Sequence, residues 1–511
     1  MEEIKISPRE YQKAIVETAK ENNTLVILPT GIGKTLIALM LSVERIKKFP
    51  GKKILILAPT RPLVEQHLES FKKNLHELFA EVDIFTGSIN AKKRQNIWKN
   101  AEIIFSTPQC IANDVRRGLY NLEDVSLLVI DEAHRCLKNY DYTFVANAYK
   151  SQALNQRILG LTASPGSDKA RVQQICKNLD IERLEIRNRD SEDVKPYLQE
   201  LNIEKHEVPF PKDFIEIQVL LKRIYNSKVE QLRNRNLLFE PANKITLLKL
   251  QNRLASQVSP GNFNVMIGMS LCAQAIKISH ALALLETQTI SGLNEYLKGL
   301  EKQAEEKKSK GVQTLVNSSE FKAARLSINK LIENKIEHPK IEELKALIKN
   351  EIKNDERTKV MIFTQYRETA NIIVNKLNEI EKIKARTFVG QAKKQSSSGN
   401  SGLSQKEQKQ VIEQFKSGEV NVLCATSIGE EGLDIPEVNV VYFYEPIPSE
   451  IRRIQRAGRT ARLSKGKLAI LITKGTRDEA HHYAAIAREK KMKKTIELVK
   501  QDLKNKTLED Y

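Results

Sequence analysis

Short apolar runs that alternate with helical patterns are the feature that most limits how this chain can fold. Five of them occur in the first 190 residues, and each ends at a turn or a polar cluster. They are residues 24–29, 53–59, 101–108, 127–132 and 158–164. Such runs are typical of strands buried on both faces of a parallel sheet. Their alternation with helices predicts repeated β-α-β units and an α/β fold.

The same pattern returns towards the C-terminus. Its runs are residues 359–365, 420–427, 438–446 and 467–473. Between the two α/β regions, apolar residues recur at the spacing of an amphipathic helix. They include Leu271, Ala275, Ile278, Leu282 and Leu285. We therefore predict three domains: an α/β domain over residues 1–200, an inserted all-helical domain over 205–335, and a second α/β domain over 336–511.

A glycine-rich segment, LPTGIGKT (28–35), connects the first predicted strand to a helix. Glycine lets backbone N–H groups approach phosphate oxygens, and the start of a helix favours an anion. A lysine at this place reaches the outer phosphates of a nucleotide, and the hydroxyl that follows binds Mg²⁺. The strict motif has glycine where this chain has Leu28. We expect the nucleotide-binding residues to be Thr30, Gly31, Ile32, Gly33, Lys34 and Thr35.

Two adjacent carboxylates, Asp131 and Glu132, end a predicted strand in the sequence VIDEAH (129–134). In nucleotide hydrolases an acid at a strand end holds Mg²⁺, and a neighbouring polar group orients or deprotonates the attacking water. We predict the first role for Asp131, together with Thr35, and the second for Glu132. A solvated acidic turn is the alternative, which the preceding glycine-rich segment disfavours.

Two other pairs of polar residues give weaker signals. Arg9 and Gln12 precede the glycine-rich segment and can hydrogen-bond an adenine edge, although the start of a surface helix explains them equally well. Thr162 and Ser164 follow a predicted strand and could relay between His134 and the second α/β domain. An ordinary helix cap also accounts for these two hydroxyls.

Arg456, Arg459 and Arg462 lie three residues apart in QRAGRTAR (455–462). On a helix, this spacing places three guanidinium groups on nearly one face. Such a row repels itself unless an anion lies opposite. Because a guanidinium binds phosphate with two parallel hydrogen bonds, we predict that the anion is a nucleotide phosphate held at Lys34. A solvated basic helix is the alternative.

The net charge of +19 suggests a polyanionic partner, most often nucleic acid, although solvated lysine-rich surfaces also produce such a charge. The inserted segment contributes basic residues that could contact a duplex backbone. They are Lys222, Arg223, Lys228, Arg233 and Arg235. No run of about 18 apolar residues predicts a membrane span. The N-terminus does not resemble a signal peptide, and the five cysteines are widely spaced. We expect a cytoplasmic, nucleoid-associated protein without zinc.

Seven short motifs occur in the order found in superfamily 2 helicases and translocases. They are PTGIGKT, APTR, STP, DEAH, TAS, IGEEGLDIP and QRAGRTAR. PREYQ, FVGQA and KGTRDEAHHY further resemble the helicase part of archaeal Hef, which is related to the Fanconi anaemia group M translocase. This resemblance covers both α/β domains. It implies two RecA-like motor domains with a thumb-like helical insert, ATP and Mg²⁺ as cofactors, and action on branched DNA such as stalled forks and Holliday-like junctions.

The resemblance also assigns roles to individual residues. Arg459 and Arg462 match the arginine fingers of the family, with Gln455 and Arg456 near the γ-phosphate. Gly432 and Asp434 match a motif that holds the ribose or orients the fingers. The residues that match motifs contacting the nucleic-acid backbone are Thr60, Arg61, Thr86, Gly87, Thr107, Gln365 and Thr426. Capping and turn formation are the alternative explanations for this last set.

Two departures from the family pattern limit what can be carried over. Ala461 stands where the last motif usually has glycine, and no nuclease signature is recognisable in the chain. We therefore do not expect nuclease activity. The family implies a nuclease domain or subunit and a sliding clamp as partners, and we expect this chain to be a monomer. A duplex-RNA-dependent ATPase and an inert nucleic-acid scaffold are the competing functions.

Overall fold

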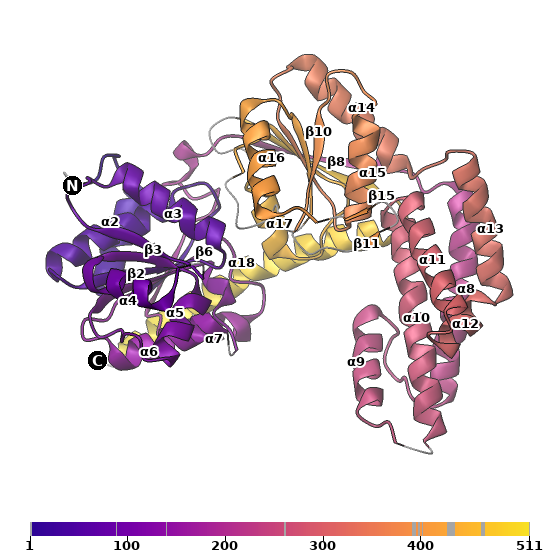
Figure 1. Cartoon of the computed structure of the whole chain (residues 1–511), viewed down its shortest axis with the longest axis horizontal. Helices are drawn as coiled ribbons and strands as arrows, with labels where there is room; N and C mark the ends of the chain where they lie inside the picture. The colour runs from indigo at the N-terminus through magenta and orange to yellow at the C-terminus, as the bar shows by residue number, and fades with distance from the viewer. Residues whose placement is uncertain are drawn as a thin grey trace.

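Two α/β domains, a helical bundle and a long C-terminal helix make up the computed structural model (Figure 1). The structure describes residues 3–509 except 88, 139, 260–261, 391–394, 397–398, 401, 427–434 and 461–464. Its two parallel sheets and the helical bundle inserted between them confirm the predicted fold class.

The first domain is a seven-stranded parallel sheet with the strand order β3-β4-β2-β5-β6-β1-β7. Its strands are β1 (Thr24–Ile27), β2 (Lys53–Leu57), β3 (Val82–Phe85), β4 (Ile103–Ser106), β5 (Val125–Asp131), β6 (Ile158–Thr162) and β7 (Arg183–Ile186). Its helices are α1 (Glu10–Glu21), α2 (Lys34–Lys48), α3 (Arg61–Asn74), α4 (Ala91–Asn100), α5 (Pro108–Arg116), α6 (Asp141–Gln152) and α7 (Lys169–Asn178). Helices α1–α3 bury one face of the sheet and α4–α7 bury the other.

The second domain is a six-stranded parallel sheet with the order β10-β13-β9-β14-β15-β8. Its strands are β8 (Leu201–Val208), β9 (Val360–Phe363), β10 (Ala385–Phe388), β13 (Val422–Ala425), β14 (Val440–Phe443) and β15 (Gly466–Thr473). Its helices are α14 (Pro339–Asn354), α15 (Arg367–Leu377), α16 (Gln405–Ser417) and α17 (Glu450–Ala457). A small antiparallel pair, β11 (Gln395–Ser396) and β12 (Gly399–Asn400), follows β10.

The helical bundle projects from the second domain (Figure 1). It consists of α8 (Lys212–Asn234), α9 (Lys244–Ala255), α10 (Phe263–Thr287), α11 (Ile290–Glu305), α12 (Lys310–Val316) and α13 (Ser319–Glu333). Within the described residues, α10 is long and apolar enough to cross a membrane by length and composition. Its Leu271, Ile278 and Leu285 nevertheless pack inside the bundle, as their predicted helical spacing requires.

Within the two parallel sheets, four strands lack the apolar runs on which the sequence prediction depends, and all four lie at sheet edges. They are β3 and β7 in the first sheet and β8 and β10 in the second. Strand β8 shows the reason, because most of its side chains are partly or fully exposed and several are charged. It pairs with β15 along its whole length, so residues 205–208 belong to the second sheet and not to a helical region.

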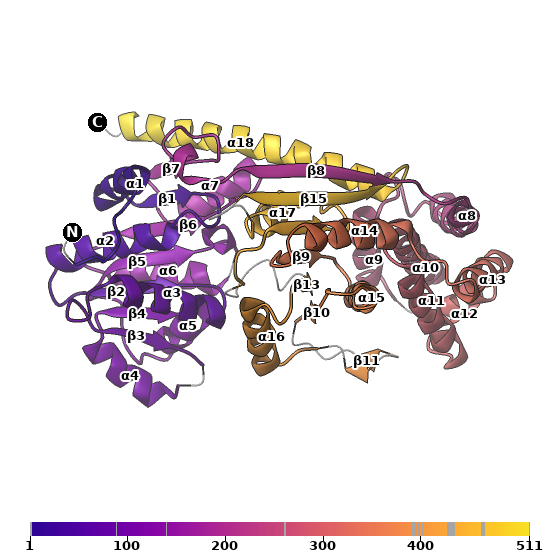
Figure 2. The same cartoon turned by 90° about the horizontal axis from the view of Figure 1, so that it is seen from above.

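Helix α18 (Arg477–Glu509) connects the two α/β domains. It starts after β15 and runs along both domains (Figure 2). Met492, Ile496 and Val499 on this helix are buried in the core of the first domain. The C-terminal part of the predicted second domain therefore packs on the first one, and the two domains are joined by burial of apolar surface as well as by the chain.

Candidate functional site

The glycine-rich connection between β1 and α2 has the backbone shape that phosphate binding needs. Gly31 and Gly33 have φ angles of 84° and 85°, in the left-handed region that other residues rarely adopt. Helix α2 begins at Lys34, directly after this turn. Its first backbone N–H groups have no partner inside the helix, and with the helix dipole they favour an anion at this end.

Tyr11 and Gln12, near the start of α1, hydrogen-bond the backbone of this connection, and Arg9 hydrogen-bonds Gln12. The Tyr11 hydroxyl donates to the Ile32 carbonyl at 2.5 Å. The Gln12 side-chain N–H donates to the carbonyls of Ile32 and Gly33 at 3.4 Å, and its oxygen accepts from the Arg9 backbone N–H at 2.9 Å. Both ends of the Gln12 amide are thus engaged within the protein. A role of Arg9 and Gln12 at an adenine edge stays a prediction, and Tyr11 is a positioning residue that sequence reasoning missed.

His67 lies between the two predicted metal ligands. Its Nδ1 is 3.3 Å from the Thr35 hydroxyl, and its Nε2 is 2.8 Å from an oxygen of Asp131. Burial alone would raise the pKa of Asp131, but His67 and then Lys34 hold this pKa below its ordinary value. A hydroxyl and an ionised carboxylate are ligands that Mg²⁺ accepts, so the residues present fit this ion. No sequence pattern pointed to His67, because it lies within a helix and matches no motif.

A chain of polar contacts leads from the second carboxylate to helix α18. Glu132 has a left-handed backbone, with φ at 51°, and its carboxylate lies 3.2 Å from His134 Nδ1. The same nitrogen is 3.2 Å from the Thr162 hydroxyl, which also accepts from the Ser164 backbone N–H at 3.2 Å. The Ser164 hydroxyl then contacts the sulfur of Met492 at 2.8 Å. The three predicted relay residues are therefore in contact, and their far end reaches α18.

The arginine segment of the second domain meets the glycine-rich connection of the first. A Cβ atom added at Gly458 would overlap the Thr30 hydroxyl and lie 2.8 Å from the Thr30 Cβ. The Ser167 backbone N–H donates across the same boundary to Glu450 at 3.1 Å. Gly458 thus lies against the glycine-rich turn of the first domain, and a role of this contact in a site between the two domains stays a prediction.

The predicted row of arginines on one helix face is wrong. Helix α17 ends at Ala457, so Arg459 lies beyond the helix. Arg456 is fully buried, with its guanidinium 4.8 Å from the ring centre of Phe363. This position inside the second domain favours a structural role for Arg456. Gln455 and Arg459 are also buried, whereas the predicted Arg462, Gly432, Asp434 and the unusual Ala461 lie outside the described residues.

The predicted site residues of the first domain share one edge of its sheet, where the parallel strands end. The glycine-rich segment follows β1, the two carboxylates lie at the end of β5, and the predicted relay residues Thr162 and Ser164 lie at the end of β6, whereas the residues predicted to contact nucleic acid follow β3, β4 and β2. Because the strand order is β3-β4-β2-β5-β6-β1, the two sets occupy adjoining halves of this edge. Ligands of open α/β sheets bind at this edge.

Two hydroxyls of the second set, those of Thr60 and Thr107, do not cap the helices that they precede, α3 and α5. The Thr60 hydroxyl is buried and has no hydrogen-bond partner among the described residues. Thr86 and Gly87 directly follow β3, and the Arg61 guanidinium contacts Glu65 at 2.8 Å. The capping explanation therefore fails for Thr60 and Thr107.

Glu445, which matches none of the motifs, holds the predicted contact segment of the second domain. One of its oxygens accepts from the Gln365 backbone N–H at 2.5 Å, and the other accepts from the Thr364 hydroxyl at 3.2 Å. Burial raises the pKa of Glu445 to about 7, although Lys340 and Arg456 lower it. Gln365 follows β9 and Thr426 follows β13, so both lie at the same edge of the second sheet.

Comparison with known proteins agrees with this arrangement. Residues 9–172 match the DEAD/DEAH box helicase family, and residues 339–464 match the helicase conserved C-terminal domain. Residues 213–338 match the helical bundle of an ATP-dependent RNA helicase family. The crystal structure of the Pyrococcus furiosus Hef helicase domain superposes with a TM-score of 0.72 and 41% identity, covering 94% of this chain and 98% of that one. The chain belongs to the superfamily 2 DEAD/DEAH-box helicases.

Longer relatives of this helicase carry different substrates in their names. The DEAD-box ATP-dependent RNA helicase FANCM of Arabidopsis thaliana is 34% identical over 487 residues, which cover 93% of this chain and 35% of that protein. An ATP-dependent DNA helicase of Neurospora crassa is 32% identical over 493 residues, which cover 93% of this chain and 42% of its own length. The helicase thus spans less than half the length of these two relatives. Its resemblance to the helicase part of archaeal Hef is confirmed.

Proposed function

We propose that this helicase is an ATP-driven DNA motor that acts on branched DNA, such as stalled forks and Holliday-like junctions. The observation that carries the proposal is the contact of Gly458 with Thr30, because it joins the arginine segment of one domain to the phosphate-binding turn of the other. In this reading, ATP binds between the domains, and its hydrolysis alternately closes and releases them.

In this proposal, residues from both domains have separate roles in phosphoryl transfer. Lys34 and the N-terminus of α2 bind the outer phosphates, Glu132 orients or deprotonates the attacking water, and Arg459 neutralises charge that develops on the transferred group. Thr35 and Asp131 would hold Mg²⁺, which supplies further neutralisation of the phosphate charge. The contact of Ser164 with Met492 offers a route by which this site affects α18.

A nucleic-acid strand is proposed to cross the other half of the sheet edge. The buried Thr60 hydroxyl, which has no partner among the described residues, supports this assignment. Short hydroxyls and backbone N–H groups bind phosphates without reading base sequence. The net charge of +19 favours a polyanionic strand as well. Thr107, Gln365 and Thr426 would extend the same path across both domains.

DNA is preferred over RNA because an ATP-dependent DNA helicase of Neurospora crassa is among the proteins that this chain resembles. The Arabidopsis relative is named an RNA helicase, so a duplex-RNA-dependent ATPase is the second candidate. Phosphate release at saturating ATP separates the two possibilities. We expect forked DNA to stimulate release more than linear duplex DNA of equal length, and RNA duplex to stimulate it least. Equal stimulation by forked and linear DNA would disprove the preference for branches, and strongest stimulation by RNA would disprove the DNA assignment.

A further inference from the structure

The helical bundle carries two phenylalanine side chains that are largely exposed. Of the 15 phenylalanines, Phe239 and Phe263 alone are largely exposed, with exposed fractions of 77% and 71%. Phe239 lies in the connection between α8 and α9, and Phe263 is the first residue of α10. In both views α9 lies on the side of α10 that is nearer the motor domains (Figures 1 and 2). Exposed apolar groups gathered in one place often mark a binding site.

The connection that carries Phe239 is anchored on the bundle. Arg253 donates to the Leu237 carbonyl at 2.6 Å, and Leu238 is buried. A Cβ atom at Gly268 would overlap the Leu237 side chain, so this glycine lets the connection lie close against α10. Because the residues before Phe239 are fixed, its ring is exposed without belonging to a loose loop. A rigid exposed ring loses little conformational entropy when another flat group stacks on it.

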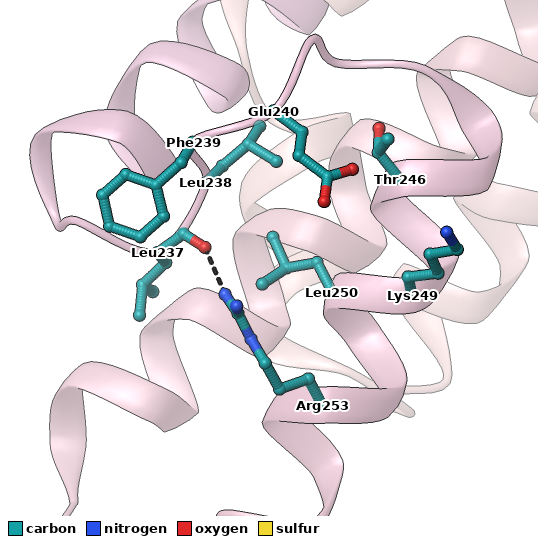
Figure 3. Close-up of a pocket in the computed structure, with 8 residues that line it drawn as sticks. All are labelled: Leu237, Leu238, Phe239, Glu240, Thr246, Lys249, Leu250 and Arg253. Carbon is teal, nitrogen blue, oxygen red and sulfur yellow. Dashed lines mark hydrogen bonds between the residues drawn. The ribbon is translucent and has the colours of Figure 1, made fainter.

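Two basic side chains, Lys249 and Arg253, and one acidic side chain, Glu240, line a cavity beside this ring. Phe239 lies at one side of a cavity of about 140 Å³ and Lys249 at the other, with Arg253 between them (Figure 3). Residues 230–255 contain five basic and two acidic residues, a net charge of +3. An aromatic platform beside positive charge is how proteins bind unpaired nucleotides, with the base stacked on the ring and the phosphate near the cations. An apolar partner protein would leave this charge uncompensated.

We propose that Phe239, with Lys249 and Arg253 beside it, stacks on an unpaired base next to the branch point of forked DNA. The proposal rests on the DNA-binding function proposed above. It gives the bundle a contact that linear duplex DNA cannot make, because the bases of a duplex are paired and stacked on one another.

The test measures affinity by fluorescence anisotropy for two forks that differ only at the nucleotides next to the branch point. One fork has normal bases there, and the other has abasic sites with the same phosphates. We expect Phe239→Ala to weaken binding of the normal fork by about 5- to 100-fold, the range found when stacking aromatics are truncated. The abasic fork should bind weakly to the unaltered chain and lose little more with Phe239→Ala.

Two further variants keep the result interpretable. Phe239→Trp retains a stacking ring and should preserve affinity for the normal fork. Leu326→Ala, which truncates an apolar side chain with 64% exposure on α13, should change neither affinity. Unchanged binding of both forks by Phe239→Ala would overturn the proposal and would point to a protein partner at this surface. If DNA failed to stimulate ATP hydrolysis by the unaltered chain, the proposed function would fail instead.

Discussion

Replacing Arg459 with alanine is expected to lower the rate of ATP hydrolysis at saturating ATP by about 10³-fold or more, the range of arginine fingers in related hydrolases. Arg459 is buried and directly follows Gly458, which contacts the phosphate-binding turn across the domain boundary. Its charge would act on the transferred phosphoryl group as negative charge spreads over the oxygens of that group. The dissociation constant for ATP should change far less than the rate, because Lys34 and α2 in the first domain remain.

Steady-state phosphate release and equilibrium binding of a fluorescent ATP analogue check this result. Arg386→Ala provides the control, since this arginine is exposed on β10 of the same domain. We expect Arg386→Ala to leave both quantities near their original values. If Arg459→Ala instead abolished ATP affinity while the rate at saturation survived, Arg459 would be a binding group and the assignment as a finger would be wrong.

Replacing Lys34 with alanine should abolish measurable ATP hydrolysis while DNA binding is retained. Lys34 opens α2, and its charge contributes to lowering the pKa of Asp131, the carboxylate that would hold Mg²⁺. Removing one charged or hydrogen-bonding group aimed at a developing negative charge costs about 10²–10³-fold in rate. Lys34 should also contribute to ATP affinity, so the combined loss at low ATP is larger. The proposed strand path lies on the other half of the sheet edge and is left intact.

Phosphate release and anisotropy with forked DNA, measured on the same preparations, test both halves of this expectation. Lys48→Ala, an exposed lysine on the last turn of α2, is the matched control and should behave like the unaltered chain. Substantial hydrolysis by Lys34→Ala would reject the assignment of the phosphate-binding turn. If Lys34→Ala abolished DNA binding as well as hydrolysis, the ATP-binding and DNA-binding halves of this sheet edge would not act independently.

Burial determined which strands could be predicted from the sequence. All nine predicted apolar runs correspond to strands inside the two sheets, because interior strands of a parallel sheet are covered on both faces. The four strands of these two sheets that lack such runs are their edge strands. In β8, for example, Glu204, Lys205 and Glu207 are tolerated because one side of the strand is unpaired and partly exposed.

The site was predictable where its chemistry is local in sequence. The glycine-rich turn, Asp131 and Glu132 follow strands directly, and the structure places them at one sheet edge. His67 could not be predicted, because it reaches Asp131 only through the packing of α3 on the sheet. The arginine spacing was misleading because α17 ends at Ala457, so Arg459 does not share a helix with Arg456.

We propose that the two motor domains meet at the phosphate-binding turn, residues 28–35, to form one ATP site. A double-mutant cycle between Gly458 and Thr30 measures whether these two residues meet when ATP is hydrolysed. Gly458 has a φ of −70°, which alanine adopts without strain, so Gly458→Ala changes only what the added methyl group touches. Overlap with Thr30 should keep the domains from closing and slow ATP hydrolysis.

The rate of phosphate release with forked DNA is measured for the unaltered chain, Gly458→Ala, Thr30→Ala and the double variant. Thr30→Ala removes the hydroxyl that the new methyl group would overlap. We expect Gly458→Ala to lower the rate less in the Thr30→Ala background, with an interaction free energy of about 0.5–3 kcal/mol, as for residues in contact. Additive penalties would contradict it, because they would mean that Gly458 and Thr30 do not meet in the working enzyme.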